Sequence, residues 1–552
     1  MKKINEKCSL ILGGCLLGIC FFLLIYGIRI VNVTYDSWLF SGEDITQHYF
    51  GWLYYRTADA KWPLGTINNM VDQNVSIIFM DSIPILALLC KPFSRFLPET
   101  FQYFGLWGVL SYGFTGGIAS LILYKFSKNK YICWLGSLFF ILSPYMLQRM
   151  FTHTSLAGQW VILIAVFLWI YNIGATRIEI KTAYWTFLLC LVTLIHLYFI
   201  PMICVFCAMD ALRYCIENRR VRGVFILLVP VVASVALLYI MGAFEETGEY
   251  AVWGLGYYSA NINALFNSMG TGRLLHKLPC GEGQAEGYGY LGAGILAMIV
   301  ADLCIVSRHL KDIISICRQQ KMLVAGSILI ILAFLVLAFS PTIMFGDKIL
   351  CSIQWPEIIM KILRIFRASG RFIWPVGYII FVISIAILCY YCNPKYTFLL
   401  LGSCFLIQFI DLGPLMKVKQ VQLNHEIVEL ESEDTHNLDI ALKDKKNVVF
   451  LPYSCVYENP KLTYAIGEYA YENKLKMNSF YIARLDSAKM NDLDMAYKKA
   501  IKDGIANDCV FIFYSEKDCL DATYPLYYYK IGECIVGVTE KNVELKGQRL
   551  IR

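Results

Sequence analysis

Long apolar runs recur along the first 415 residues and are separated by shorter polar segments. Many of these runs approach the ~20 residues that a helix needs to cross a bilayer. Taken in order, they predict about 11 membrane-spanning helices, some of them shorter than this length. The expected spans are 8–29, 103–125, 131–148, 155–174, 182–198, 201–215, 223–243, 291–307, 322–340, 372–392 and 396–412.

Basic residues between the spans predict the orientation, because Lys and Arg favour cytoplasmic loops. The tracts at 125–130, 213–222 and 308–321 are the strongest cytoplasmic markers. A full span at 76–96 would place the first tract outside, so we expect a re-entrant or surface helix there. The stretch 182–210 is too long for one span, and we expect Pro201 to break it into a hairpin.

This orientation predicts a multi-pass cell-membrane protein with a cytoplasmic N-terminus and an outer C-terminus. Three long segments, 30–76, 243–290 and 341–371, would then lie outside, where we expect the function. From residue 416 the apolar runs shorten, and 447–452, 509–514 and 527–538 are typical of strands around a helix at 492–502. The predicted fold class is mainly α. A polytopic transmembrane helix bundle (1–415) precedes a small extracytoplasmic α/β domain (416–552).

The composition supports this interpretation. Hydrophobic residues make up 57% of the chain, charged residues only 16%, and the mean hydropathy is +0.54, which excludes an ordinary soluble protein. The net charge of +7 is explained by the cytoplasmic tracts, so no nucleic-acid partner is expected. Most of the 20 cysteines lie in apolar runs. Cys204 and Cys207 have C-x-x-C spacing, but the sequence has no second such pair to complete a zinc site. We therefore assign no metal ligands.

The first outer segment carries candidates for acid–base chemistry. Glu43 and Asp44 precede an aromatic stretch, and a helix that opens at Asp44 would place His48 on the same face. A carboxylate just outside the hydrocarbon suits a general base for a hydroxyl acceptor, so Asp44 and His48 are the first catalytic candidates. The alternative is that the two acids only form a solvated helix start.

Two further ionisable residues could take part. Asp81 lies inside an apolar stretch, where a charged group is costly and usually functional or paired, which makes it a second catalytic acid candidate. His153 follows the third expected span on the outer side and is a candidate substrate contact. A hydrogen bond between helices would account for His153 equally well.

The third outer segment contains three arginines, Arg364, Arg367 and Arg371. Their spacing of three and four residues predicts that they share one helical face. Forked guanidinium groups match phosphate oxygens, so we interpret the set as a lipid-phosphate clamp. Ordinary contact with lipid headgroups is the alternative.

The middle outer segment combines aromatic residues, amides and glycines with Glu282, Gln284 and Glu286. These groups suit a sugar or another polyol as substrate, and a structural loop that covers the bundle is the alternative. The sequence has no P-loop, no dinucleotide fingerprint after a strand and no G-x-S-x-G elbow. The sequence therefore gives no sign of a nucleotide site at the cytoplasmic face. A transferase that faces outward has no access to cytosolic nucleotide sugars, so it would need a donor carried by a lipid.

The order of these features resembles the GT-C class of membrane glycosyltransferases, whose members take a sugar from a polyprenyl phosphate. The segments that carry this likeness are Met80–Pro84, Lys91–Phe93, Lys125–Lys128 and Leu142–Tyr145. Other segments look more closely like a little-characterised bacterial family of GT-C-like membrane proteins, over nearly the whole chain. They are Asp44–Trp52, Gly281–Gln284 with Glu286–Gly287, Phe366–Phe372 and Asn478–Arg484.

The resemblance implies transfer of a sugar from a polyprenyl-phosphate carrier to a cell-envelope glycan or lipid acceptor in contact with membrane lipid. It assigns the base to Asp44, although the class usually separates its two acids by one residue and Glu43 and Asp44 are adjacent. Asp81 therefore stays an alternative base. A mechanism with a divalent metal ion and one without any cofactor are both open. The rival functions are a transporter or flippase of a lipid-linked glycan and a non-catalytic envelope assembly protein.

Overall fold

The computed structural model describes residues 2–41, 44–72, 74–245, 253–423, 431–479, 487–520, 524–541, 544–545 and 548–550. The chain divides into two compact units. Unit 1 comprises residues 1–33, 103–237 and 252–423, and unit 2 comprises residues 34–102, 238–251 and 424–552. Residues 34–76 of the first expected outer segment therefore share a unit with the C-terminal region.

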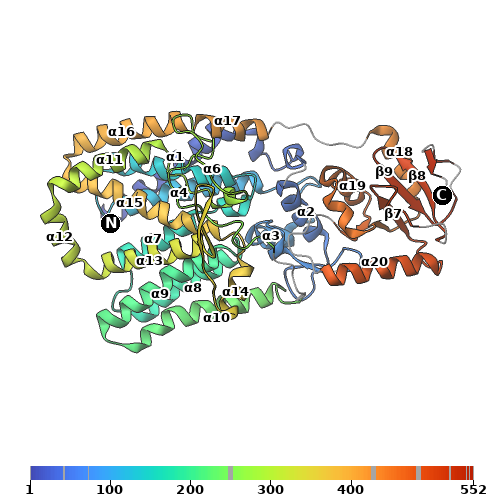
Figure 1. Cartoon of the computed structure of the whole chain (residues 1–552), viewed down its shortest axis with the longest axis horizontal. Coiled ribbons are helices and arrows are strands. Elements are labelled where there is room, and N and C mark those ends of the chain that lie inside the picture. Colours follow the sequence, from blue (N-terminus) through green and yellow to red (C-terminus); the bar gives the residue numbers. More distant parts are fainter. Residues whose placement is uncertain are drawn as a thin grey trace. The chain divides into compact units, whose positions relative to one another are not determined.

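Unit 1 consists mainly of helices, and its long helices run side by side (Figure 1). Helix α12 joins α11 to α13 at one end of the unit, where the chain bends by 92° after α11. The last residues of α10 belong to unit 2. The helices are α1 (Lys2–Tyr26), α4 (Phe104–Leu123), α5 (Lys130–Ile141), α6 (Pro144–Arg149), α7 (Trp160–Tyr171), α8 (Ile178–Thr193), α9 (Phe199–Asn218), α10 (Phe225–Ile240), α11 (Ala293–Arg308), α12 (Leu310–Gln319), α13 (Lys321–Phe339), α14 (Glu357–Ile365), α15 (Trp374–Tyr391), α16 (Pro394–Asp411) and α17 (Gly413–Gln422).

Seven helices of the described chain are long and apolar enough to cross a membrane, or nine if each of two bent pairs is one span. The expected count of 11 is not confirmed. Expected span 131–148 overlaps α5, whose 12 residues extend only about 18 Å, against roughly 30 Å of hydrocarbon. Expected span 182–198 overlaps the 16-residue α8, which begins earlier, at Ile178, and is also short. The orientation stays a prediction.

The expected hairpin within 182–210 is present, but its position differs from the expectation. The chain breaks between α8 and α9, at residues 194–198, and Pro201 lies in the first turn of α9. A proline there removes no helical hydrogen bond, because the first amides of a helix have no partner within it. The stretch 76–96 forms no full span, since its longest helix, α3 (Pro84–Cys90), has seven residues.

Unit 2 contains a mixed six-stranded sheet, drawn in red tones in Figure 1. The strand order is β10-β8-β9-β7-β5-β6; β5 pairs in parallel with β6 and β7, and the other pairs are antiparallel. The three predicted strand regions and the predicted helix are confirmed. The elements are β5 (Asn447–Phe450), β6 (Lys476–Met477), β7 (Cys509–Phe513), β8 (Tyr527–Ile531), β9 (Cys534–Val538), β10 (Gln548–Leu550), α18 (Ser432–Leu442), α19 (Pro460–Glu472) and α20 (Ser487–Lys502).

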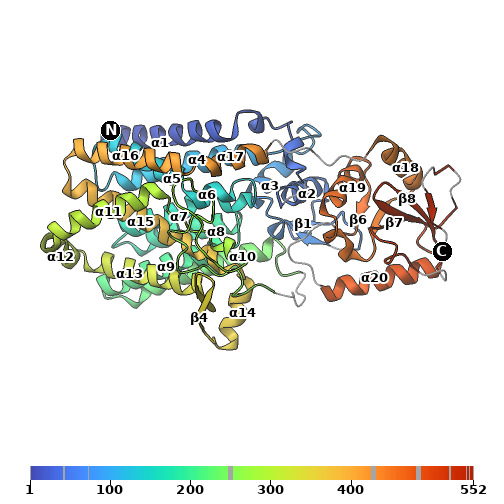
Figure 2. The same ribbon diagram turned by 45° about the horizontal axis from the view of Figure 1, so that its top comes forward.

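The first expected outer segment packs directly on this sheet and its helices. It contributes α2 (Asp44–Thr57) and the pair β1 (Thr66–Ile67) and β2 (Val75–Ser76), and α3 follows in the stretch 76–96. Val71 is buried in the core of the sheet with Val449 and Phe511, and the Val71 amide donates to the Met477 carbonyl. Figure 2 shows α2 beside α19, where the Phe50 ring centroid lies 5.4 Å from that of Tyr464.

Candidate functional site

Two tight turns in unit 1 bring a carboxylate and a guanidinium group together. Glu286 lies in the 3-10 turn Gln284–Gly287, and Arg371 lies in the 3-10 turn Ser369–Ile373. A Cβ atom at Gly370 would lie only 2.5 Å from the Gly287 Cα, and one at Gly287 only 2.6 Å from the Ala260 Cα. The two glycines therefore permit the close backbone approach that places Glu286 beside Arg371.

Glu286 bridges two buried arginines. Its Oε2 accepts from Arg371 Nε at 2.9 Å and lies 2.7 Å from Arg371 Nη2. The same oxygen accepts from Arg149 Nη2 at 3.0 Å, and Oε1 accepts from Arg149 Nη1 at 3.3 Å. The arginine side chains are only 5% and 10% exposed, whereas Glu286 is 23% exposed. The carboxylate thus neutralises one of two buried positive charges.

Aromatic rings complete the environment of the arginines. The Arg371 guanidinium lies 4.6 Å from the ring centroid of Tyr198, and the Arg149 guanidinium lies 5.7 Å from that of Trp374. These cation–π contacts fix the planes of the guanidinium groups. The Tyr198 hydroxyl also accepts from the Ala368 amide, which ties the turn before Arg371 to the start of α9.

Among the described side chains of this cluster, the cations outnumber the carboxylates. Burial by itself raises the pKa of Glu286, but Arg149, Arg371 and His153 together hold that pKa well below its usual value. His153 Nε2 lies 3.9 Å from Glu286 Oε1, and His153 is 21% exposed. Lys419 is buried and donates to the carbonyl of Met150, the residue after Arg149. The excess of buried cations, with a partly exposed Glu286 and His153, suits an anionic ligand.

The prediction that three arginines share one helical face is wrong. Helix α14 ends at Ile365, because the amides of the next turn bond to other segments: Ala368 to Tyr198 and Gly370 to the Tyr258 carbonyl. Arg364 is exposed and pairs with Glu357 at 2.8 Å. Arg367 donates to the Trp253 carbonyl at 3.5 Å on an exposed surface. Only Arg371 joins the buried cluster.

The other candidates of the middle segment occupy different positions. Gln284 is fully buried; its Oε1 accepts from Asn261 and from the Gly281 amide, so it fixes the local fold. Glu282 is exposed and accepts from the Tyr257 hydroxyl at 3.4 Å. Of the three polar residues predicted here, Glu286 alone contacts the arginines.

In unit 2 the structure brings His48 and Asp81 together. His48 is buried in α2, and its Nε2 lies 3.8 Å from Oδ2 of Asp81, which is 28% exposed. The Ser82 hydroxyl donates to the His48 carbonyl at 2.6 Å. Gly51 allows this approach, because a Cβ atom there would clash with the Ser82 hydroxyl. An imidazole and an accessible carboxylate can exchange a proton or together donate to a divalent ion.

The backbone around Asp81 is unusual. Asp81 has a φ of 52° and Ile83 a φ of 53°, both in the left-handed region that disfavours branched side chains. Such strain often accompanies a functional position. Asp44 is the first residue of α2, as predicted, one helical turn before His48. Glu43 and residues 480–484 of the Asn478–Arg484 motif lie outside the described residues.

Arg149 was not among the predicted site residues. It ends the helix α6, and its partner Glu286 is 137 residues away in the sequence. The available signal was a single arginine at the end of an apolar run, where an ionisable group is usually paired or functional. Tyr198, Trp374 and Lys419 carried no comparable signal.

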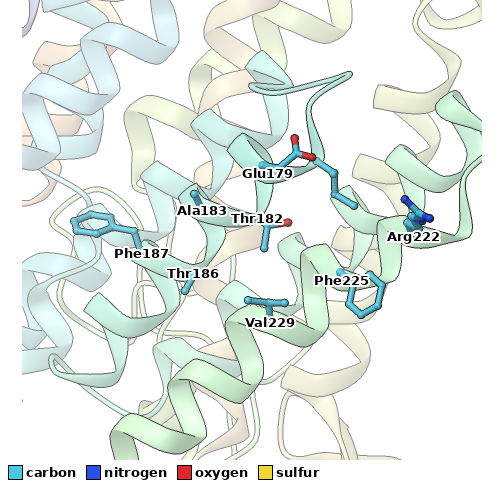
Figure 3. A pocket seen from close by; sticks show the side chains of 9 residues that line it. Glu179, Thr182, Ala183, Thr186, Phe187, Arg222, Phe225 and Val229 are labelled. Carbon is cyan, nitrogen blue, oxygen red and sulfur yellow. The ribbon is translucent and has the colours of Figure 1, made fainter.

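A lateral groove of about 700 Å³ lies between α8 and α10 (Figure 3). Phe187, Phe225 and Val229 give it a largely apolar lining, and Glu179 and Arg222 stand at one end. That end lies at the turns that join α7 to α8 and α9 to α10, since Asn218 donates to the Ala175 carbonyl. Of the two helices that form the groove, α10 is long and apolar enough to cross a membrane, together with the turn before it, and α8 is not.

Comparison with family models gave two matches. A model described as "Domain of unknown function (DUF6311)" matches residues 15–413, more than half of the chain. A model described as "DUF6311 C-terminal domain" matches residues 438–539. A comparison with curated proteins gave no match.

Proposed function

Since the chain belongs to the family described as Domain of unknown function (DUF6311), a description that names no activity, we propose a function from its own residues. In this proposal the protein is a GT-C-type membrane glycosyltransferase. It would move a sugar from a polyprenyl-phosphate carrier to a cell-envelope glycan or lipid at the outer membrane face. The proposal includes the finer topology of about 11 spans, with the N-terminus in the cytoplasm and the C-terminal region outside.

The observation that supports this proposal most is the cluster of Arg149, Glu286 and Arg371. Two buried arginines share one carboxylate, that of Glu286. Buried charges are costly and persist where a partner or a ligand compensates them. A phosphate on a lipid carrier has the charge and the acceptor oxygens to act as such a ligand.

The proposed reaction gives one role to the arginines of unit 1 and another to the carboxylates of unit 2. The bond between C1 of the sugar and the carrier phosphate oxygen breaks, and the polyprenyl phosphate leaves with the electron pair. The arginines would stabilise this leaving charge. The acceptor hydroxyl forms the new bond to C1, with inversion, and gives its proton to a carboxylate base.

Asp44 and Asp81 are the two candidates for this base. Asp44 opens α2, where the helix N-terminus is electrostatically favourable for a carboxylate. Asp81 is accessible and has the imidazole of His48 within 3.8 Å, which can accept or return a proton. We retain Asp44 as the leading base, from the resemblance, and place Asp81 and His48 beside it in the proposed chemistry.

The transport alternative requires charged groups along the spans that could serve as a pathway. Lys181 in α8 and Asp210 in α9 are a buried charged pair, and each compensates the charge of the other. Lys181 Nζ lies 2.7 Å from both carboxylate oxygens, and the Trp185 indole donates to one of them at 2.9 Å. This saturated arrangement favours a structural role for the pair and gives the transport alternative no support.

The test is the envelope-glycan profile of cells that lack the gene and carry it back as wild type, Asp44→Asn or Asp81→Asn. Protein level in the membrane is measured for each variant, and Asp59→Asn, an exposed acid of unit 2, is the control. We expect the deletion to lose one sugar and Asp44→Asn to reproduce that loss. If only Asp81→Asn reproduces it, Asp81 is the base. If both variants behave as wild type while the deletion is defective, the transferase proposal is wrong.

A further inference from the structure

Unit 2 contains a polar pocket of about 460 Å³ that the proposed transfer chemistry does not use. It lies between the C-terminal end of α2, the segment 94–99 and the end of α19 with the start of β6. Figure 2 shows α2, α19 and β6 close together in this unit. Its volume is in the range of about 300–1,000 Å³ that is usual for small-ligand sites.

The lining of the pocket carries an excess of positive charge. Four cationic side chains face two carboxylates, those of Glu99 and Glu472. Arg56 is held in place by the carbonyls of Glu99 and Pro98, to which its guanidinium donates at 2.8 and 3.0 Å. The other three cations are exposed, and no ion pair of theirs occurs in the described part of the chain: Arg95, Lys474 and Lys476.

Two polar atoms of the lining lack a hydrogen-bond partner among the described residues. They are the buried Asn69 Oδ1 and Ser94 Oγ. The Asn69 amide nitrogen is already used, because it donates to Thr57 and to the Tyr54 carbonyl, so the oxygen is an acceptor in a fixed position. A bound water or ligand can satisfy such a buried polar atom.

Aromatic surface adjoins these polar atoms. Tyr471 is partly exposed and lines the pocket, and the buried ring of Tyr54 lies behind it, with the two centroids 6.0 Å apart. Aromatic faces next to an amide and a hydroxyl are the combination that binds sugar rings, since C–H groups pack on the rings while hydroxyls bond to the polar atoms.

Lys474 occupies a backbone position that suits glycine better. It follows α19 with a φ of 58°, and the Leu475 amide donates to the Ala470 carbonyl at 2.8 Å, as at many helix ends that use glycine. A lysine there accepts backbone strain that glycine would avoid. The retained strain favours a use for the charged side chain at the pocket.

We propose that this pocket of unit 2 binds an anionic glycan, with a sugar ring against Tyr471, a hydroxyl on Asn69 and Ser94, and acidic groups on Arg95, Lys474 and Lys476. The proposal goes beyond the transferase proposal and does not depend on it. Binding is measured without a sugar donor, so its failure leaves the transferase proposal standing.

The test uses the full-length protein in detergent and measures its affinity for tetragalacturonate, a carboxylated tetrasaccharide, and for maltotetraose, a neutral tetrasaccharide of equal length. We expect tetragalacturonate to bind at least tenfold more tightly. Lys474→Gly relieves the backbone strain and removes the charge, so it should retain the thermal stability of wild type and weaken tetragalacturonate binding at least tenfold. Ser94→Ala should weaken it severalfold.

Lys499→Ala is the matched control, because Lys499 is an exposed lysine of α20 that does not line the pocket. It should bind as wild type does. If Lys474→Gly folds poorly, Arg95→Ala takes its place, because it removes another exposed positive charge from the same pocket. The proposal is overturned if tetragalacturonate does not bind, if maltotetraose binds equally well, or if the pocket variants and Lys499→Ala bind alike.

Discussion

Nη2 of Arg371 lies 2.7 Å from Oε2 of Glu286, and this pair is possible because two glycines let their turns touch. Arg149 bonds to the same carboxylate from a different helix. Three chain segments, far apart in the sequence, therefore meet at one carboxylate.

Replacing Glu286 with Gln should destabilise unit 1, because it leaves two buried guanidinium groups without their counter-charge. We expect the melting temperature of the detergent-solubilised protein at pH 7.5 to fall by about 5 °C or more. Glu282→Gln, at an exposed position in the same segment, should change it by about 1 °C or less.

The effect of Glu286→Gln should depend on pH. The pKa of Glu286 is depressed in the folded protein, so its stabilising contribution is complete above the unfolded value of about 4.3 and is lost as pH falls toward the folded value. The difference in melting temperature between wild type and Glu286→Gln should therefore shrink from pH 5.5 to pH 3.5. A difference that stays constant or grows on acidification contradicts the assigned ion cluster.

Gly370→Ala should disturb the site through sterics alone. The new methyl group would lie 2.5 Å from the Gly287 Cα, and backbone atoms cannot yield as a flexible side chain does. Overpacking of this kind costs about 1–3 kcal/mol. The control is Gly402→Ala in α16, where the nearest atom is 4.0 Å away. Comparable thermal stability of the two variants would show that the turns do not need the close approach.

Arg371→Lys keeps the charge and removes the forked donor. If Arg371 holds a phosphate, sugar transfer to the envelope acceptor should fall by about tenfold or more, because a charged hydrogen bond contributes about 1.5–3 kcal/mol. Arg364→Lys is the matched control, since Arg364 is exposed and paired with Glu357. Equal transfer rates in both variants, at equal protein levels, would remove Arg371 from the donor site.

Asp494 of unit 2 offers a test of the C-terminal region. Burial raises its pKa to about 6, although the Tyr453 amide donates to both carboxylate oxygens at 3.1 Å. Because the folded pKa exceeds the unfolded value of about 3.9, the ionised group opposes folding, and stability falls as pH rises through this window. Asp494→Asn should therefore gain melting temperature relative to wild type between pH 5 and pH 7.5. A gain that is absent or independent of pH contradicts the burial argument.

Much of the helical part could be predicted from the sequence, because long apolar runs favour helices that are long and apolar enough to cross a membrane. The apolar runs do not show where each helix ends. One example is α5, which ends at Ile141, before α6 begins at Pro144, although both helices lie in one expected span. The C-terminal strands were predictable from their β-branched and aromatic content. Their shared core with Val71 was not, because that contact joins residues nearly 400 positions apart.

The site was only partly predictable for the same physical reason. Spacing of three and four residues indicates a helix only if the backbone bonds within itself, and the amides of Ala368 and Gly370 bond to Tyr198 and Tyr258 instead. The contact between Glu286 and Arg149 depends on tertiary packing that no local pattern encodes. In contrast, Asp81 was recognisable as an ionisable residue inside an apolar stretch, and the structure gives it His48 as a partner.

The central claim is sugar transfer from a polyprenyl-phosphate donor. The most direct measurement adds the purified protein to membranes of the deletion strain that contain radiolabelled polyprenyl-phosphate sugars, and follows label into the envelope acceptor. The account predicts that wild-type protein transfers label and that Asp44→Asn and Arg371→Lys do so at least about tenfold more slowly. Transfer that is absent with the wild type, or equally fast with both variants, would contradict it.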